Sequence, residues 1–296
     1  MKKSIILILL FALLSGCANT SFTDNGKINV VATTTMVADL VSEIGADYIN
    51  LIGLMEIGVD PHLYQAKASD AETLYNANVV VYNGVHLEAK LAEVLGYLDN
   101  TISLENGLVT SELITITEQS YDPHIWFSIN LWKKAAQEVA EELSIIDPEN
   151  ADGYQKNLEL YLIELDDLKE YATKEINKIP LEQRILVTAH DAFAYFAEEF
   201  NFEVKAIQGI STQAEASTSV ISDLADYIVE NQIPAIFSES SISPKTITSL
   251  QDAVRSRGYQ VLVGEELYSD SLKQDSNYLE TFRANVDAIV SALKQG

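Results

Sequence analysis

Short runs rich in β-branched residues alternate along this chain with segments of helical spacing, and this alternation restricts its fold most. Before residue 148 the predicted strands are 27–34, 49–55 and 79–83, with helices at 36–45 and 69–76. After residue 180 the predicted strands are 184–188, 204–207, 235–238 and 260–263, with helices at 192–200, 218–231, 243–257 and 278–295. Strands separated by helices pair in parallel, because each helix returns the chain to the starting edge of the sheet. We therefore predict an α/β fold of two lobes, each a mainly parallel sheet flanked by helices.

The segment between the two halves, residues 148–178, predicts one long helix. Its apolar side chains recur at helical spacing, at Leu158, Tyr161, Leu165, Leu168 and Ala172. About 25 helical residues would span about 38 Å at 1.5 Å per residue. A helix of that length could join two lobes rigidly, or it could pack along one lobe.

The N-terminus has the pattern of an export signal. Two lysines precede an apolar run at 5–14, which is too short to cross a hydrocarbon core that needs about 20 apolar residues. This signal segment ends in Leu-Ser-Gly-Cys17, which resembles a bacterial lipobox. The resemblance implies cleavage before Cys17, its lipidation, and an extracytoplasmic protein anchored to the bacterial membrane. The alternative is an ordinary signal peptide with Cys17 incidental.

These patterns divide the chain into five predicted parts. They are a lipoprotein signal peptide (1–16), a polar tether (17–26), an N-terminal lobe (27–147), a linking helix (148–179) and a C-terminal lobe (180–296). A mature chain of this length exceeds one ordinary core, in keeping with two lobes.

Composition restricts the function. The formal net charge is −25, from 44 acidic and 19 basic residues, which argues against a nucleic-acid partner because that binding needs a basic surface. Cys17 is the only cysteine, so an internal disulfide and a cysteine metal site are both excluded. We expect a monomer.

Two of the four histidines, His62 and His124, stand in the same tripeptide, Asp-Pro-His. Proline fixes φ and removes a hydrogen-bond donor, so each imidazole leaves a stiff turn. The aspartate two residues earlier could cap the turn or orient the ring, as acceptors beside metal-bound imidazoles usually do. The repeated frame indicates two metal ligands.

The other two histidines have different surroundings. His190 follows the strand 184–188, at the end of a parallel strand where open α/β sheets place their ligand sites. It could instead be incidental beside Asp191 at a helix start. His86 stands just beyond another strand. We favour a structural role, or a position next to the metal ligands, over a role as a ligand.

A fourth ligand should come from the second half, because His62 and His124 both fall in the first. The carboxylates considered there are Asp191, Glu215, Glu239, Glu265, Glu266 and Asp270. Asp270 lies in a loop after the last strand, and Glu239 ends a strand. The residues by themselves do not choose between them.

Many segments of the chain resemble the metal-binding lipoproteins of manganese/zinc-type ABC importers, the TroA-like family. They are VVATTTMVADLVSEIG, GVDPHLY, ANVVVYNGVHLE, DPHIWFS, AHDAFAYF, IQGISTQAEAS, IFSESSISPKT and GEELYSDSL. The resemblance implies metal ligands at His62, His124, His190 and Asp270, between two lobes joined by one long helix. Glu239 then becomes a neighbour of the site. The implied partner is the permease of an ABC importer.

The implied ligand set favours zinc over manganese. Three imidazoles and a carboxylate suit tetrahedral zinc, and zinc exceeds manganese in affinity at most such sites. The stretch between His86 and His124 lacks the histidine-rich loop of many zinc-dedicated members, whereas His190 stands where some manganese-dedicated members have glutamate. One divalent ion is expected as cargo, with zinc favoured and manganese the alternative.

Two other functions compete with transport: zinc metallohydrolase and surface adhesin. A zinc metallohydrolase usually keeps an open position on the metal, and four protein ligands would close it, so we expect no enzymatic activity. A surface adhesin on the same scaffold is the other alternative, but no sequence feature specifies a host molecule. For the transport function, affinity should fall steeply below pH 6.5, because histidine must be neutral to bind metal.

Overall fold

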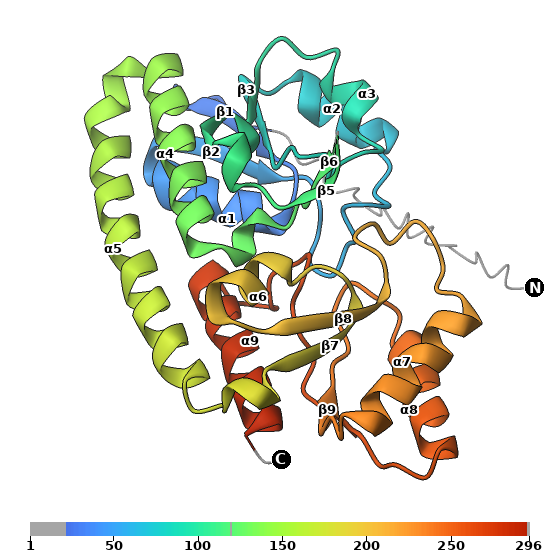
Figure 1. The fold of residues 1–296 in the computed structure, drawn as a ribbon. Coiled ribbons are helices and arrows are strands. Elements are labelled where there is room, and N and C mark those ends of the chain that lie inside the picture. Colours follow the sequence, from blue (N-terminus) through green and yellow to red (C-terminus); the bar gives the residue numbers. More distant parts are fainter. Residues whose placement is uncertain (1–21, 119, 295–296) are drawn as a thin grey trace, which may run out of the picture.

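The computed structural model describes residues 22–118 and 120–294, which form two α/β lobes beside one long helix (Figure 1). The first lobe is built on a four-stranded sheet of order β2-β1-β3-β4, in which every pair is parallel. Its strands are β1 (Ile28–Ala32), β2 (Ile49–Gly53), β3 (Val79–Tyr82) and β4 (Thr101–Ser103). Its helices are α1 (Thr35–Gly45), α2 (Ala68–Tyr75), α3 (Ala92–Leu95) and α4 (Ile129–Ile146).

Strand β1, one of the two inner strands of this sheet, shows why its sequence ends in a continuous run of apolar, mostly β-branched residues. Val30, Val31 and Ala32 are fully buried, and Val30 and Val31 belong to separate core clusters. A parallel strand covered on both faces requires an apolar side chain at every position rather than an alternating pattern. The chain then turns into α1, whose first turn is capped because the Thr34 hydroxyl accepts the Val37 N–H at 3.2 Å.

The second lobe repeats the arrangement. Its strands are β7 (Ile185–His190), β8 (Glu203–Gln208), β9 (Ala235–Ile236) and β10 (Leu262–Val263), and its helices are α6 (Ala194–Phe200), α7 (Thr218–Glu230), α8 (Lys245–Ser256) and α9 (Tyr278–Leu293). Strands β7 and β8 are parallel, as are β9 and β10. The N–H of Phe237 donates to Val187 O at 2.8 Å and joins the two pairs. Figure 1 places α7 and α8 on one side of these strands and α6 and α9 on the other.

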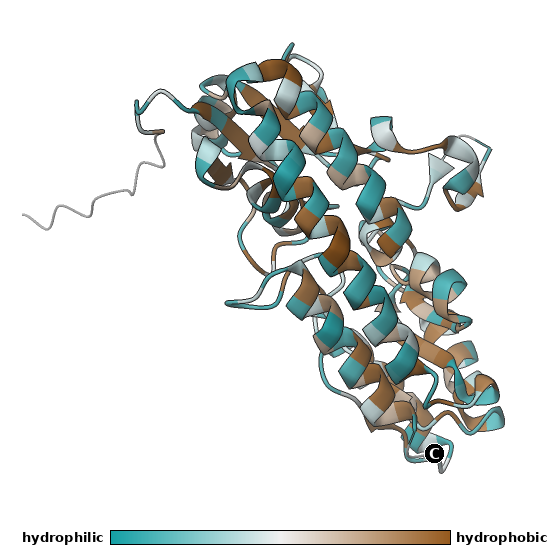
Figure 2. Ribbon diagram, turned by 90° about the vertical axis from the view of Figure 1, so that its left-hand side faces the viewer, coloured by the Kyte–Doolittle hydropathy of each residue, from teal (hydrophilic) through white to brown (hydrophobic). Residues whose placement is uncertain are grey.

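The middle segment forms the single helix α5 (Ala151–Ile176), whose 26 residues span about 39 Å. It runs along both lobes in Figures 1 and 2. It packs against α1 and α4 of the first lobe and against α9, which follows the second sheet. All five residues of the predicted apolar stripe are buried. The helix is therefore a rigid connection between lobes, and it does not pack along one lobe only.

The lobes also touch each other directly through aromatic side chains. Phe127, in the short 3-10 helix η4 (Ile125–Phe127) of the first lobe, lies 4.4 Å from Phe193 of the second, measured between ring centroids. One core cluster contains residues of both lobes and of α5. A shared core of this kind opposes a wide hinge motion.

The predicted fold class is confirmed, although five α-helices and β-strands among the described residues between 92 and 146 were missed. They include α3, strand β4 at the edge of the first sheet, and the antiparallel pair β5 (Thr115–Thr117) and β6 (Ser120–Tyr121). The fifth is α4, whose Ser128 hydroxyl accepts the Leu131 N–H and whose apolar residues have clear helical spacing. The five domain boundaries remain predictions. The signal peptide, Cys17 and residues 17–21 of the tether lie outside the described residues. None of the helices in the described part combines the length and apolar composition that a membrane crossing requires.

Candidate metal centre

Four side chains meet where the two lobes face each other: His62, His124, His190 and Asp270. One potential donor atom from each lies within 4.8 Å of all the others. His62 Nε2 is 3.3 Å from His124 Nε2, which is 3.5 Å from Asp270 Oδ1. His190 Nε2 is 3.2 Å from Asp270 Oδ2. The structure thus brings together the three predicted histidines and one of the six candidate carboxylates.

Each lobe supplies two of these residues from loops or strand ends. His62 follows β2 in a turn, and His124 lies between β6 and η4. His190 is the last residue of β7, and Asp270 follows β10. Parallel strands end at the same edge of a sheet, so both sheets present their carboxyl ends to one point.

The group is closed to solvent. His124 and His190 are fully buried, and His62 and Asp270 are only 3% and 2% exposed. Within the described part of the chain, His190 Nε2 and Asp270 Oδ1 make no contact with hydrogen-bond geometry, although His190 Nε2 lies within ion-pair distance of the other Asp270 oxygen. Buried polar atoms without a partner cost free energy, and a bound cation would satisfy both.

Carboxylates behind two of the rings orient them. Asp122 Oδ1 accepts the backbone N–H of His124 at 2.9 Å and lies 2.7 Å from His124 Nδ1. Glu239 accepts the backbone N–H of His190 at 2.8 Å and lies 2.5 Å from its Nδ1. Both contacts leave Nε2 facing the centre, which is the arrangement found behind metal-bound imidazoles.

The two Asp-Pro-His turns are similar in backbone but differ in what their aspartates do. Asp60 Oδ1 accepts the backbone N–H of His62 at 2.9 Å, as Asp122 does for His124. The second oxygen of Asp60 accepts a hydrogen bond from Thr212 of the other lobe at 2.6 Å. The aspartate of the first turn therefore connects the lobes, whereas that of the second orients a ring.

Burial and neighbouring charge set the protonation of the metal-free site. Burial lowers the pKa of His62 to about 4, against the opposing attraction of Asp270. Burial also lowers the pKa of His190, but the charges of Glu239 and Asp270 outweigh it and hold that pKa well above its usual value. Asp270 loses hydration on burial, yet the nearby histidines keep its pKa below the usual range. The metal-free site therefore pairs a protonated His190 with an ionised Asp270.

The donor distances are compatible with a metal ion. A tetrahedron with bonds of about 2.0–2.1 Å has edges of about 3.3 Å. Three contacts, of 3.2, 3.3 and 3.5 Å, are close to such an edge, but they involve both oxygens of Asp270, and the four donor atoms as a set lie within 4.8 Å of one another. Asp270 turns one oxygen toward His124 and the other toward His190, so it could also bind in a bidentate manner.

The remaining predicted residues lie outside the four-residue group. Glu239 contacts His190 and is a neighbour of the site, as expected. His86 is exposed, like Glu215, Glu265 and Glu266. Asp191 is partly buried, and burial raises its pKa.

Sequence reasoning missed Trp126, which holds the site across the lobes. Its indole N–H donates to Ser269 O at 2.8 Å, next to Asp270. Its ring lies 5.3 Å from that of His124, between centroids, in an edge-to-face contact. In the sequence, only its position two residues after His124 could have indicated this role.

Comparisons with known proteins agree over nearly the whole chain. The family model ZnuA, described as zinc-uptake complex component A, periplasmic, matches residues 30–292. The zinc-binding protein TroA of Treponema pallidum is 40% identical over 276 residues, covering 91% of this chain and 90% of TroA. A solved structure of that protein superposes with a TM-score of 0.89, at 40% identity, over 90% of this chain and 99% of its own.

Other relatives carry manganese in their names. The manganese-binding lipoprotein MntA of Bacillus subtilis is 38% identical and covers 99% of this chain and all of its own. The manganese ABC transporter substrate-binding lipoprotein PsaA of Streptococcus pneumoniae is 29% identical, with 99% of each chain covered.

Proposed function

This chain belongs to the ZnuA family of metal-uptake proteins, and from that premise we propose that it binds one divalent transition-metal ion outside the cytoplasm and delivers it to an ABC importer. The observation that carries the proposal is the buried convergence of three imidazoles and one carboxylate from both lobes. Because each lobe contributes two donors, the ion would hold the lobes together. Release would then require the importer to separate them slightly.

The proposed ligands are His62, His124, His190 and Asp270, and the proposed cargo is zinc or manganese. The nitrogen-rich donor set favours zinc. Manganese would use the same donors with Asp270 bidentate, and relatives named for either metal are similar to this chain. We propose zinc as the ion bound more tightly in vitro.

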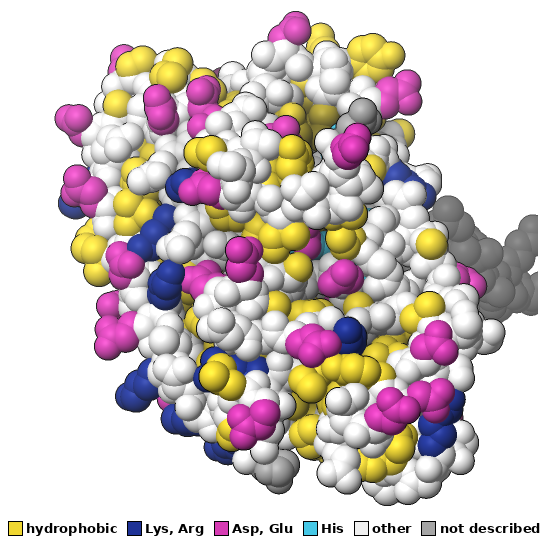
Figure 3. All heavy atoms as spheres, in the orientation of Figure 1, with side chains coloured by type: hydrophobic (Ala, Val, Ile, Leu, Met, Phe, Trp, Pro, Cys, Tyr) yellow, Lys and Arg dark blue, Asp and Glu magenta, His cyan; other side chains and the backbone are white. Residues whose placement is uncertain are grey.

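The location and partners of the protein are also proposals. We propose that the protein is lipidated at Cys17 and attached to the outer face of the bacterial membrane. We also propose that it is a monomer and that it docks on the permease of an ABC importer. The names of MntA and PsaA as lipoproteins support the anchor, and the name of PsaA supports the importer. Acidic side chains are spread over the face shown in Figure 3, so charge alone singles out no docking surface there.

A binding role is favoured over catalysis and adhesion. The relatives are named as binding proteins, and four protein donors would leave no place for a reactive water on tetrahedral zinc. No described surface favours an adhesive role.

Equilibrium metal binding tests the proposal. The chain lacking residues 1–17 should bind one zinc or manganese per molecule, measured by competition with a chromophoric chelator after EDTA treatment. Asp270→Ala should lower the affinity by at least about 100-fold, because it removes a donor and the charge that balances the ion. Asp275→Ala, at an exposed position nearby in the sequence, is the control. Wild-type affinity in the Asp270 variant would disprove the assigned site.

A further inference from the structure

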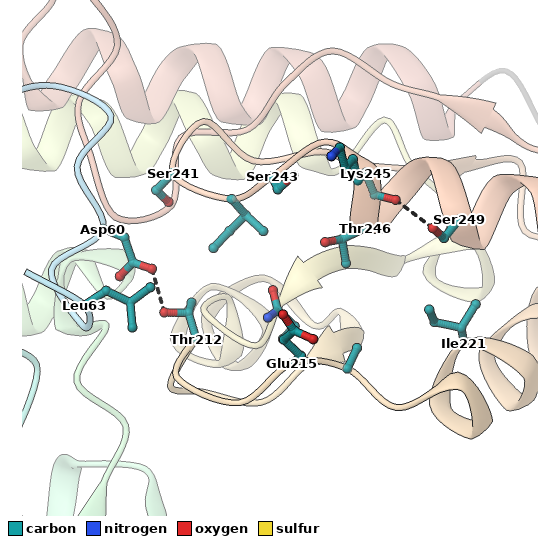
Figure 4. A pocket seen from close by; sticks show the side chains of 13 residues that line it. Asp60, Leu63, Thr212, Glu215, Ile221, Ser241, Ser243, Lys245, Thr246 and Ser249 are labelled. Carbon is teal, nitrogen blue, oxygen red and sulfur yellow. Dashed lines mark hydrogen bonds between the residues drawn. The ribbon is translucent and has the colours of Figure 1, made fainter.

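A cavity of about 410 Å³ lies beside the metal centre, at the boundary between the lobes (Figure 4). Its walls are the end of β8, the loop 209–217, the start of α8 and the turn that contains Asp60. We refer to it as the interlobe cavity. The ligands themselves are at most 3% exposed, so an ion needs a path through the protein to reach them.

Two residues that line the interlobe cavity also contact residues of the metal centre. Asp60 accepts the backbone N–H of His62 at 2.9 Å. The hydroxyl of Ser241 donates to Asp270 Oδ2 at 3.4 Å. Two lining residues of the cavity are therefore in direct contact with metal-centre residues.

One hydrogen bond joins the two lobes in the lining of the interlobe cavity. Thr212, in the loop 209–217 of the second lobe, donates its hydroxyl to Asp60 Oδ2 at 2.6 Å, as Figure 4 shows. The next residue, Gln213, reaches His62 O at 3.5 Å. Thr212 is only 8% exposed, so the residue is buried at the boundary between the lobes.

The lining of the interlobe cavity suits a hydrated cation. Asp60 and Glu215 supply carboxylates, and Ser241, Ser243 and Thr246 supply hydroxyls. Oxygen donors bind divalent cations, but imidazole suits zinc better, so the ion would favour the final ligands over the cavity. Lys245 also lines the cavity and forms no ion pair within the described residues.

We propose that the interlobe cavity is the passage through which the metal ion enters and leaves, and that the Thr212–Asp60 hydrogen bond is its gate. Asp60 would serve as a transient oxygen ligand between the cavity and the four final ligands. This inference rests on the proposed function and adds a kinetic role for residues that are not themselves ligands. A gate changes entry and exit together and leaves the equilibrium affinity unaltered.

Thr212→Val tests the gate, because it keeps the shape of the side chain and removes the hydroxyl. We expect both the association and the dissociation rate constants of zinc to rise about two- to tenfold, the factor that corresponds to one hydrogen bond, with Kd unchanged. Stopped-flow mixing with a chromophoric chelator measures both rates. Thr248→Val is the matched control, since Thr248 lies on the same helix as the cavity wall, is exposed and lines no part of the cavity.

Charge variants test the passage. Glu215→Gln should slow zinc association about two- to threefold and Lys245→Gln should speed it by a similar factor, with both effects fading at high salt. Thr246→Trp, which fills the cavity from the first turn of α8, should slow both rates. Equal rates in all these variants and wild type would overturn the passage.

The outcomes separate this inference from the proposed function. If wild-type protein binds neither zinc nor manganese, the proposed function fails. If wild type binds but Thr212→Val exchanges the ion at the wild-type rates, the gate is wrong while the function stands. A rise in the dissociation rate alone would show that Thr212 only supports the bound state, and would also overturn the gate.

Discussion

At the scale of single residues, the site depends on side chains that do not touch the ion. Asp122 contacts both the ring Nδ1 and the backbone N–H of His124, and Glu239 contacts the same two groups of His190. These contacts fix the tautomer and direct Nε2 inward. Ligand identity alone therefore underestimates what the binding site requires.

Glu239→Gln should weaken zinc binding by about tenfold, although all four ligands remain. The amide keeps an acceptor for His190 but removes the negative charge that makes the ring a better donor. Chelator competition at pH 7 measures the change, and Glu230→Gln, on the exposed end of α7, provides the comparison. Equal affinities would show that Glu239 only fills space.

Zinc binding at neutral pH should release the proton of His190. The pKa of His190 is well above its usual value in the metal-free site, whereas that of His62 is about 4, so His62 is already neutral. Affinity should therefore keep rising with pH beyond 6.5, up to the raised pKa of His190. Calorimetry in buffers of different ionisation enthalpy counts the protons. The Glu239→Gln variant should release fewer protons per zinc bound. Zinc binding by wild type without proton release would contradict a protonated His190 in the metal-free site.

At the scale of elements, α5 determines how the two lobes are held. Its buried face packs against α1, α4 and α9, so one helix contributes to the stability of both lobes. Most of that stability comes from tertiary packing of the apolar stripe, since helix propensity alone contributes little.

Leu165→Ala should lower the free energy of unfolding by about 2–5 kcal/mol, because it leaves a cavity at a fully buried position. Ile163→Ala, in the same helix and 59% exposed, should change it by less than about 0.5 kcal/mol. Urea denaturation of the metal-free chain compares the two. Similar losses in both variants would mean that α5 is not packed as described.

At the scale of the whole molecule, the lobes are joined by a shared core as well as by the proposed ion. Side chains of α1 reach the start of α9, where Asp39 Oδ2 accepts the Tyr278 N–H at 3.0 Å. Burial raises the pKa of Asp39 to about 7. A carboxyl whose pKa is raised on folding favours the folded state while protonated, so stability is lost as pH rises from about 4 to 7.

Asp39→Asn should therefore stabilise the metal-free protein at pH 8, by on the order of 2 kcal/mol, and change little at pH 4. The amide oxygen can still accept the Tyr278 N–H. Urea unfolding at both pH values provides the test, with Asp47→Asn, an exposed position, as control. A variant less stable than wild type at pH 8 would show that the ionised carboxylate holds α9 in place.

The sequence by itself determined the α/β class, the long middle helix and the two Asp-Pro-His turns. These depend on local rules: periodicity selects strand or helix, and proline fixes the turn that presents His62 and His124. It left Asp270 and Glu239 open until the family resemblance favoured Asp270, since both follow strands of the second lobe. Only the tertiary structure decided which of the two lies among the candidate ligands and which contacts a ligand from behind, because donors must meet within a few ångströms across the boundary between the lobes. Asp270 joins His62, His124 and His190, while Glu239 lies behind His190. The interlobe cavity and its Thr212–Asp60 bond likewise exist only where the two lobes meet.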